Sequence, residues 1–171
     1  MPRAILIGAP GSGKSTVGRA LARELGVTFA DTDARIVEQE HRSIAEIFSH
    51  DGEPAFRIIE RDVVLNTLVS EAGVISLGGG AVLDTQVQKA LKESTADVIY
   101  LEVGLSNVLG RIGTRNDRPL LAKNAEHQWI ELMALRAPIY QELANIHIST
   151  DNKKASEVAA QLIIRMGIVH D

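Results

Sequence analysis

Short apolar runs alternate along the chain with longer segments in which apolar residues recur at helical spacing. The apolar runs that predict buried strands are residues 4–7, 27–30, 74–77, 97–102 and 146–149. Because helical segments lie between them, the strands are expected to run parallel and to be joined by crossover helices. The pattern therefore predicts an α/β protein of three layers, in which a parallel sheet lies between two layers of helices.

Local signals predict where two helices begin. Ser43 is followed three residues later by Glu46, which is the spacing of a capping box, and Pro54 stands where the first turn of a helix tolerates proline. The second helix is expected from about residue 54 to residue 69, with Arg57 away from its apolar side. That mostly apolar stripe is predicted to contain Phe56, Ile59, Val63 and Leu65 or Asn66.

Two stretches fit the alternation of strand and helix poorly. Residues 33–60 insert helices before the third predicted strand. Residues 111–124 are polar and contain Gly113 and Pro119 as breaks. Three arginines fall within eight residues of this second stretch, namely Arg111, Arg115 and Arg118. It is therefore predicted to be a mobile basic loop.

The composition is that of an ordinary folded protein. The chain has 171 residues, of which 45% are apolar and 23% charged, and this predicts one domain spanning residues 1–171. A net charge of −4 argues against general binding of nucleic acid. The absence of cysteine excludes disulfides and thiolate sites. No apolar run is long enough to cross a bilayer and no secretory pattern is present, so we expect a cytoplasmic protein.

A glycine-rich turn follows the first predicted strand. Residues 8–15 match G-x-x-x-x-G-K-[ST] at every fixed position. Glycines let backbone N–H groups converge on phosphate oxygens, Lys14 adds a positive charge, and the Ser15 hydroxyl is suited to bind Mg²⁺. A tight turn without a ligand is the alternative, but the flanking strand and helix favour the phosphate loop. The sequence therefore predicts a site for the phosphates of a nucleoside triphosphate.

Two carboxylates end the second predicted strand. Asp31 and Asp33 are two residues apart, so they would face the same side if the chain stays extended, near the sheet edge where α/β proteins bind ligands. One is suited to assist Mg²⁺, and the other to accept hydrogen bonds from a substrate hydroxyl. Asp31 is the metal candidate, because the third strand ends in Ser76 rather than in an aspartate. A helix N-cap or a solvated loop charge is the alternative.

Three successive glycines, Gly78, Gly79 and Gly80, follow the third predicted strand. They expose unhindered backbone N–H groups, so a small oxygen-rich ligand can lie against the main chain. A plain flexible turn is the alternative. The D-x-x-G and N-K-x-D motifs of GTPases are missing.

Taken together, these motifs resemble the shikimate kinase family. The matching segments are GAPGSGKST, the DTD at residues 31–33, EPAFRIIE around Arg57, SLGGGA, RPLL from Arg118 and ALRAPIY around Arg136. They occur in the family's order and spacing from Arg3 to about Tyr140. Phosphate loops recur in many families, whereas this combination is specific. One departure is the segment 151–155, which lacks the proline that family members often place beside the adenine.

The resemblance implies a fold and a reaction. The fold is that of the nucleoside-monophosphate kinases, with a five-stranded parallel sheet in the order 2-3-1-4-5. It includes a substrate-binding insertion at about residues 33–60 and a lid at about residues 111–124. The reaction is the ATP-dependent phosphorylation of the 3-hydroxyl of shikimate with release of ADP. It is a step toward chorismate and the aromatic amino acids.

The resemblance also implies a role for each site residue. ATP would be held by Gly11, Ser12, Gly13, Lys14, Ser15, Thr16, Arg111 and Arg118. Mg²⁺ would lie at Ser15 and Asp31. Shikimate would be held by Asp33, Arg57, Gly78, Gly79, Gly80 and Arg136. The two arginines of this last set would bind its carboxylate, and Asp33 its ring hydroxyls. Lys14, Asp33 and Arg118 are the expected catalytic residues, with Asp33 also a candidate general base.

Other functions stay open on the residues alone. Arg57 or Arg136 taken singly is typical of a surface ion pair. A gluconate or nucleotide kinase would use the same phosphate loop, and a regulatory protein would bind ATP without turnover. The triple glycine with RPLL favours shikimate. The expected partners are shikimate and ATP, without nucleic acid or membrane, and the chain is expected to be a monomer.

Overall fold

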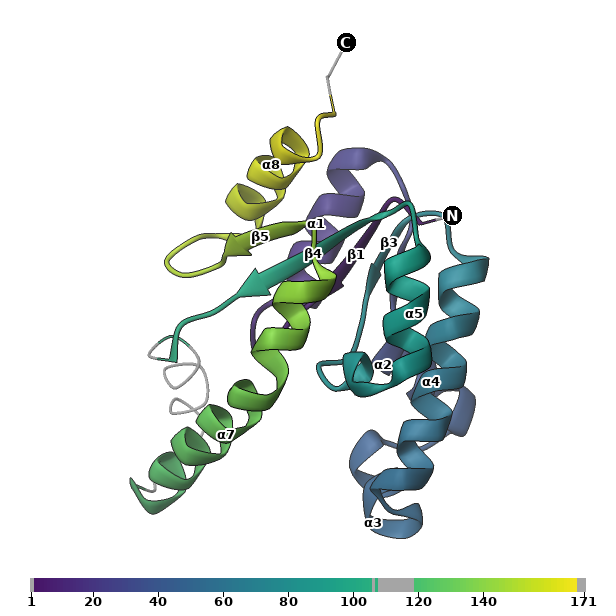
Figure 1. The fold of residues 1–171 in the computed structure, drawn as a ribbon, viewed down its shortest axis with the longest axis vertical. Helices are drawn as coiled ribbons and strands as arrows, with labels where there is room; N and C mark the ends of the chain where they lie inside the picture. The colour runs from purple at the N-terminus through teal and green to yellow at the C-terminus, as the bar shows by residue number, and fades with distance from the viewer. Residues whose placement is uncertain (1, 106, 108–118, 169–171) are drawn as a thin grey trace.

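A five-stranded parallel sheet forms the centre of the computed structural model, which describes residues 2–105, 107 and 119–168, and their side chains apart from those of residues 119–123. The strands lie in the order β2-β3-β1-β4-β5, as the family resemblance implied (Figure 1). Their bounds are β1 Ala4–Ile7, β2 Phe29–Asp31, β3 Val74–Ser76, β4 Asp97–Glu102 and β5 Ile146–Ser149. The ranges expected for β1, β4 and β5 are confirmed. The strand β2 begins and ends later than expected, and β3 ends one residue earlier.

Helices cover both faces of the sheet, so the predicted three-layer arrangement is confirmed (Figure 1). Their bounds are α1 Lys14–Leu25, α2 Thr32–Glu40, α3 Ile44–Asp51, α4 Glu53–Ser70, the 3-10 turn η1 Ala81–Leu83, α5 Thr85–Glu93, α7 Pro119–Leu143 and α8 Ala155–Arg165. One face packs against α1 and α8, and the other against α4, α5 and α7. No helix among the described residues is long and apolar enough to span a membrane.

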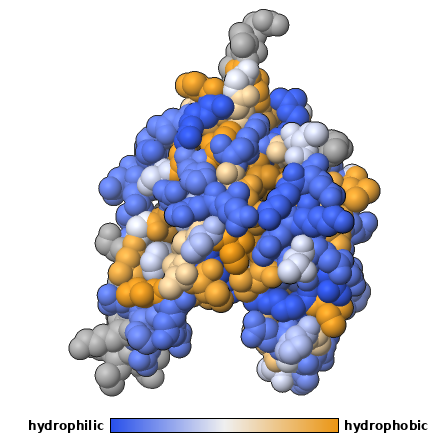
Figure 2. All heavy atoms as spheres, in the orientation of Figure 1, coloured by the Kyte–Doolittle hydropathy of each residue, from blue (hydrophilic) through white to orange (hydrophobic). Residues whose placement is uncertain are grey.

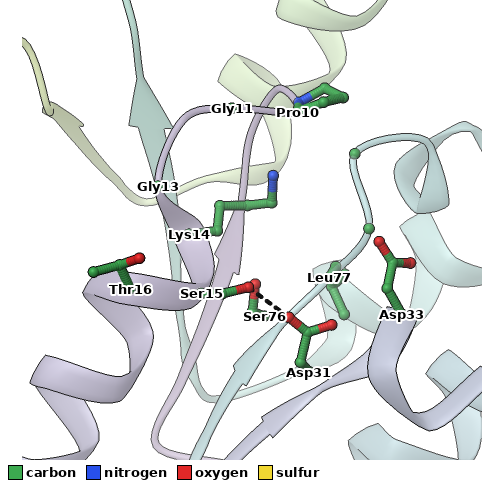
Figure 3. A pocket seen from close by; sticks show the side chains of 12 residues that line it. Pro10, Gly11, Gly13, Lys14, Ser15, Thr16, Asp31, Asp33, Ser76 and Leu77 are labelled. Atoms are coloured by element: carbon green, nitrogen blue, oxygen red, sulfur yellow. Dashed lines mark hydrogen bonds between the residues drawn. The ribbon is translucent and has the colours of Figure 1, made fainter. Parts of the chain in front are cut away.

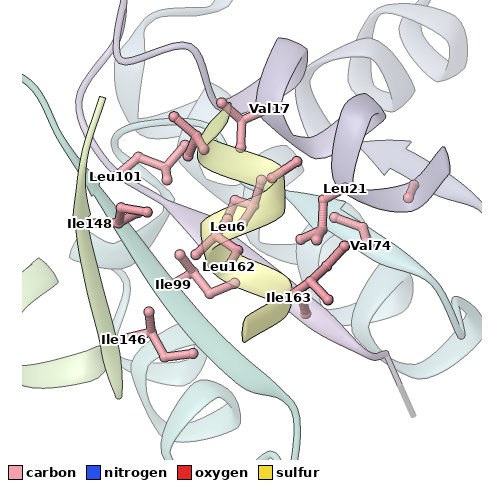
Figure 4. Packing of buried hydrophobic residues seen from close by; sticks show 14 residues of the cluster. Leu6, Val17, Leu21, Val74, Ile99, Leu101, Ile146, Ile148, Leu162 and Ile163 are labelled. Carbon is pink, nitrogen blue, oxygen red and sulfur yellow. The ribbon is translucent and has the colours of Figure 1, made fainter. Parts of the chain in front are cut away.

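The central strand β1 has apolar side chains on both faces of the sheet, so helices must pack on both. Its side chains alternate between the two faces, as they do in any strand. Leu6 belongs to the apolar cluster with Val17 of α1 and Leu162 of α8, which Figure 4 shows. Ile5, one residue earlier, belongs to the cluster on the opposite face with Val64 of α4. A strand that is apolar at every position is therefore buried on both sides.

The helices α2, α3 and α4 form a separate group beside the sheet. They enclose a small apolar cluster of Ile36, Ile47, Phe56 and Val63. The predicted start of α3 is confirmed, because the Ser43 side chain accepts a hydrogen bond from the backbone N–H of Glu46. The surface is hollowed between the N-terminal part of α7 and the α3 end of this group (Figure 2).

The apolar stripe predicted for α4 is confirmed with Leu65 as its last member. Phe56 and Val63 are buried, and Ile59 and Leu65 pack, partly buried, against the apolar clusters, whereas Asn66 is exposed. The buried side continues instead through Val64 and Thr67, at the three- and four-residue steps of an α-helix. Glu60 is also on this buried side, although it is charged, and it is only 3% exposed.

Candidate active site

The phosphate loop joins the end of β1 to the start of α1. Gly8, Gly11 and Gly13 have φ values of 149°, 80° and 88°, a region that side chains rarely adopt. A Cβ on Gly8 would also lie 2.7 Å from the Leu101 carbonyl oxygen of β4. The loop thus needs glycine for both conformation and space. It leads into α1, whose first N–H groups and positive end face an anion.

Lys14 is buried beneath this loop. Its ammonium donates to the carbonyl oxygens of Gly8, at 2.8 Å, and Ala9, at 2.9 Å. Burial lowers the pKa of Lys14 to about 8, and the negative charges of Asp33 and Asp31 oppose this shift in part. A phosphate bound beside Lys14 would raise its pKa again, because an anion favours the charged ammonium.

Ser15, in the first turn of α1, lies beside Asp31 at the end of β2. The Ser15 hydroxyl donates to Asp31 Oδ2 at 2.5 Å, as Figure 3 shows. Asp31 Oδ1 also accepts from the N–H of Ala34, at 3.2 Å, so Asp31 is the N-cap of α2. Asp31 is thus the helix N-cap that the sequence gave as an alternative. The same side chain also lies beside Ser15, as expected of a metal ligand.

Asp33 lies in the first turn of α2, so the chain does not stay extended through residues 31–33, which was the condition for the two carboxylates to face one side of a strand. Asp31 ends the strand and turns the chain into the helix by capping it. Asp33 nevertheless points into the same pocket as Lys14 (Figure 3). Burial raises the pKa of Asp33, and the charge of Asp31 adds to this effect, while Lys14 and Arg57 oppose it.

The pocket that contains these residues has a volume of about 330 Å³. Its lining consists of Pro10, Gly11, Gly13, Lys14, Ser15, Thr16, Asp31, Asp33, Ser76, Leu77, Gly78 and Gly79. The phosphate loop, the start of α2 and the end of β3 thus surround one space. The predicted residue Ser12 is fully buried behind the loop, where its carbonyl oxygen accepts from the Thr150 hydroxyl at 3.2 Å.

The triple glycine runs from the end of β3 into η1. None of Gly78, Gly79 and Gly80 has a positive φ, so conformation does not demand glycine here. Space does. A Cβ on Gly78 would lie 2.5 Å from Asp33 Oδ1, and one on Gly80 would lie 2.4 Å from Arg57 Nη1. The chain passes in close contact with the site residues, which favours a ligand-lining role over a plain flexible turn.

Arg57 and Arg136, which are far apart in the sequence, converge on this turn. A Cβ on Gly79 would lie 3.3 Å from Arg136 Nη1, beside the neighbouring approach of Arg57 to Gly80. Arg136 is 8% exposed, and its Nε is buried without a hydrogen-bond partner. The structure describes no ion pair for Arg136, so the surface ion pair that the sequence left open is not found for it in the described part of the chain.

Glu60 is the site residue that the sequence did not indicate. Its Oε1 accepts from Arg57 Nη1 at 2.7 Å, and a Cβ on Gly78 would lie 3.1 Å from its Oε2. Burial raises the pKa of Glu60, while the hydrogen bond and charge of Arg57 lower it. The available signal was its spacing: Glu60 stands four residues after the buried Phe56 and three after Arg57.

Some expected residues fall outside this description. Arg111 and Arg118, with most of the lid expected at residues 111–124, lie beyond the described side chains. Near the segment expected to approach adenine, Asp151 accepts hydrogen bonds from the N–H of Gly104, at 2.9 Å, and from Asn107 Nδ2, at 2.8 Å. No group of three or more histidine or acidic side chains suited to a metal occurs among the described residues.

Comparison with known proteins agrees with this geometry. A family model described as shikimate kinase matches residues 10–167. The chain belongs to the shikimate kinase family. It is 44% identical over 166 residues to a shikimate kinase of Rhodococcus jostii (strain RHA1), covering 96% of this chain and 98% of that protein. It is 46% identical over 166 residues to a shikimate kinase of Rhodococcus erythropolis (strain PR4 / NBRC 100887), covering 96% and 97% of the two chains.

A solved structure is also similar over nearly the whole chain. The shikimate kinase from Acinetobacter baumannii in complex with shikimate has a TM-score of 0.86 and 32% identity, and the match covers 99% of this chain and 97% of that one. Membership of the family makes this chain a kinase that uses ATP and acts on shikimate in aromatic biosynthesis, as its motifs predicted. The gluconate-kinase, nucleotide-kinase and regulatory alternatives are set aside on this ground.

Proposed function

We propose that the described pocket transfers the γ-phosphoryl group of ATP to the 3-hydroxyl of shikimate, with release of ADP. The observation that carries this assignment is the convergence of Arg57 and Arg136 on a glycine turn that also borders Asp33 and the phosphate loop. Two guanidiniums and one carboxylate around a single space suit a hydroxylated acid. Guanidiniums match a carboxylate in geometry, and a carboxylate accepts from hydroxyls.

The acid end of the substrate would lie between the two arginines. The N–H groups of Gly79 and Gly80, within the described part of the chain, donate no hydrogen bond to the protein. A substrate carboxylate is suited to accept from these donors as well as from Arg57 and Arg136. Gly78 completes the wall by allowing Asp33 to approach the main chain.

Asp33 would act on the hydroxyl that receives the phosphoryl group. Its carboxylate would orient that hydroxyl, whose oxygen forms the new bond to the γ-phosphorus while the bond to the ADP oxygen breaks. The hydroxyl proton would pass to Asp33, and the raised pKa of Asp33 makes it a stronger base than an exposed aspartate. Positioning carries most of the rate, because the transition state of phosphoryl transfer is loose.

Two oxygen-bearing side chains at one end of this pocket suit Mg²⁺. The Ser15 hydroxyl and the Asp31 carboxylate lie within hydrogen-bonding distance, and oxygen ligands of this kind suit an ion that keeps several waters. When bound, Mg²⁺ would neutralise charge on the phosphates. Lys14 would turn from the loop carbonyls to the phosphate oxygens, and the N–H groups of Gly11, Ser12, Gly13 and Thr16 would face them.

The remaining assignments concern the insertion, the lid and the state of the protein in the cell. We propose that residues 33–60 form the substrate-binding insertion and that residues 111–124 form a lid. The lid would bring Arg118 to the γ-phosphate and Arg111 to the adenine, and its closure would exclude water. We also propose a single domain that acts as a monomer in the cytoplasm, on the basis of chain length and the absence of cysteine. Gel filtration at assay concentration tests the monomer.

The test is acceptor-dependent release of ADP. Enzyme with ATP and Mg²⁺ is supplied with shikimate, gluconate or AMP, and the product is identified by mass and by the ³¹P–¹H coupling of the phosphorylated carbon. Release that depends on shikimate alone, with phosphate on the 3-oxygen, is the expected result. Release with gluconate or AMP but not with shikimate would overturn the assignment of the acid-binding arginines.

A further inference from the structure

The helix α7 contributes two neighbouring side chains to the glycine turn. Arg136 and Tyr140 are four residues apart, so they project from the same side of the helix. Arg136 lies beside Gly79. The Tyr140 hydroxyl donates to the Gly79 carbonyl oxygen at 2.5 Å. The same turn of helix thus contacts the triple glycine through a charge and through a hydrogen bond.

Tyr140 is held firmly. It is fully buried, it belongs to the apolar cluster on its face of the sheet, and its ring stacks on Tyr100 with 5.1 Å between centroids. Burial raises the pKa of Tyr140 to about 12, so the phenol keeps its proton at physiological pH and remains a donor. A rigid ring therefore presents its hydroxyl to the Gly79 carbonyl, with the Arg136 side chain as a second hydrogen-bonding neighbour.

The geometry of the peptide bond extends the effect of this contact. No peptide bond in the described chain is cis, so the Gly79 carbonyl and the Gly80 N–H point in opposite directions. Because Tyr140 draws the carbonyl toward the buried core, the Gly80 N–H is turned away from that core. Gly80 is itself buried, lies against Arg57, and its N–H has no protein acceptor among the described residues. A buried donor of this kind needs an acceptor, and a bound ligand or an ordered water supplies one.

The backbone groups of Gly78 are held by hydrogen bonds of their own. Gly78 N–H donates to the Thr32 hydroxyl at 3.2 Å, and the Ala81 N–H donates to the Gly78 carbonyl at 3.1 Å. Among the described residues, only Tyr140 restrains the peptide between Gly79 and Gly80 by a hydrogen bond. Glycine without such a restraint has a wider choice of φ and ψ than other residues, because it carries no Cβ.

We infer that Tyr140 is a positioning residue for the acid substrate. Its hydroxyl orients the peptide between Gly79 and Gly80, so that the Gly80 N–H faces the substrate carboxylate beside Arg57. This role rests on the proposed function, since it presumes that the acid end binds there. It adds a residue that never touches the substrate and acts through the main chain.

The experiment compares Tyr140→Phe with Tyr100→Phe. Both variants lose one phenolic hydroxyl from the same stacked pair, but the structure gives the Tyr100 hydroxyl no hydrogen bond to the described residues. For Tyr140→Phe, the KM for shikimate is expected to rise about tenfold, the effect of losing one orienting hydrogen bond. The KM for ATP should stay within twofold, kcat should fall less than the KM rises, and the increase should be the same from pH 6.5 to 9. Tyr100→Phe should match the wild type.

Several results would overturn the inference. Equal kinetics in the two variants would do so, and so would a parallel rise in both KM values, which indicates general loosening. A second measurement needs no variant: in ¹⁵N-labelled wild type, the Gly80 amide signal should shift as shikimate is added, and an unmoved signal refutes the role even if Tyr140→Phe fails to fold. Wild type that does not turn over shikimate would instead refute the proposed function, so the two failures are distinguishable.

Discussion

Replacing Glu60 with glutamine tests whether a buried carboxylate sets the position of Arg57. Glu60 is 3% exposed and accepts from Arg57 Nη1 at 2.7 Å. The other acidic partner of Arg57 is Glu53, at 3.4 Å, and its side chain is 61% exposed. Glutamine keeps the size and one acceptor oxygen but removes the negative charge. Arg57 should then sample other positions and meet the substrate carboxylate less often.

The expected size follows from the hydrogen bond. A hydrogen bond to a charged partner contributes about 1.5–3 kcal/mol, and a neutral one about 1 kcal/mol, so the exchange weakens the restraint on Arg57 by about 0.5–2 kcal/mol. If this loss passes to substrate binding, the KM for shikimate rises about 2- to 30-fold. The repulsion between Glu60 and an acid substrate acts in the opposite direction, and we expect it to be smaller because Arg57 lies between the two carboxylates and neutralises Glu60.

Steady-state kinetics with varied shikimate and saturating ATP measure this effect. Glu53→Gln makes the same chemical exchange at the exposed partner and should change KM less than about twofold, as exposed ion pairs contribute little. Burial raises the pKa of Glu60, so its ionised form lowers stability above its unfolded pKa, and Glu60→Gln should not lower Tm at pH 7. A fall in KM would refute the reasoning, because repulsion would then outweigh orientation, and equal effects of the two variants would refute it as well.

Three further predictions concern the phosphate end of the pocket. Asp33→Asn should lower kcat by about 10²- to 10⁴-fold if Asp33 is the base. Because the pKa of Asp33 is raised in the folded protein, the same variant should also have a higher Tm than the wild type at pH 7. This gain in Tm should disappear below about pH 4, where the Asp33 carboxyl is neutral in both the folded and the unfolded wild type. Retained turnover or an unchanged Tm contradicts these two parts. Calorimetry in buffers of different ionisation enthalpy should detect proton uptake on ATP binding near pH 8, since Lys14 has a pKa of about 8 before the phosphate binds. Lys14→Arg should abolish this uptake. Uptake that persists in the variant would assign the proton to another group. Asp31→Asn keeps a good helix cap, so Tm should hold while the Mg²⁺ needed for half-maximal rate rises about tenfold; an unchanged Mg²⁺ requirement argues against Asp31 at the metal.

The elements that the sequence predicted best depend on local patterns. The strands at residues 4–7, 97–102 and 146–149 were recovered at both ends. The first and the middle of the second are apolar runs buried on both faces, and the third, at the edge of the sheet, alternates between buried and partly exposed residues. The cap at Ser43 was recovered because its hydrogen bond spans only three residues. The sequence did not decide where two local preferences competed. An extended chain through residues 31–33 and a helix N-cap were both left open, and the capping preference of Asp31 starts a helix there.

The site was predicted unevenly for a similar reason. The phosphate loop is one continuous segment whose residue types already imply its ligand. Glu60, in contrast, was missed because a charged residue on a helix is usually exposed, and only the packing of α4 buries it against Arg57. Tyr140 was read only as part of a family motif, because nothing near it in the chain indicates that its hydroxyl reaches Gly79.

By itself the sequence determined the class of fold, the order of its elements and the phosphate-binding turn. Each of these follows from the spacing of neighbouring residues and from what glycine, proline and apolar side chains allow the local backbone to do. Only the tertiary structure decided that Arg57 and Arg136 meet at one glycine turn, and that Gly78, Gly79 and Gly80 are glycine for lack of space rather than for flexibility. Contacts between distant segments are set by how helices pack on the sheet, and no local pattern encodes that packing.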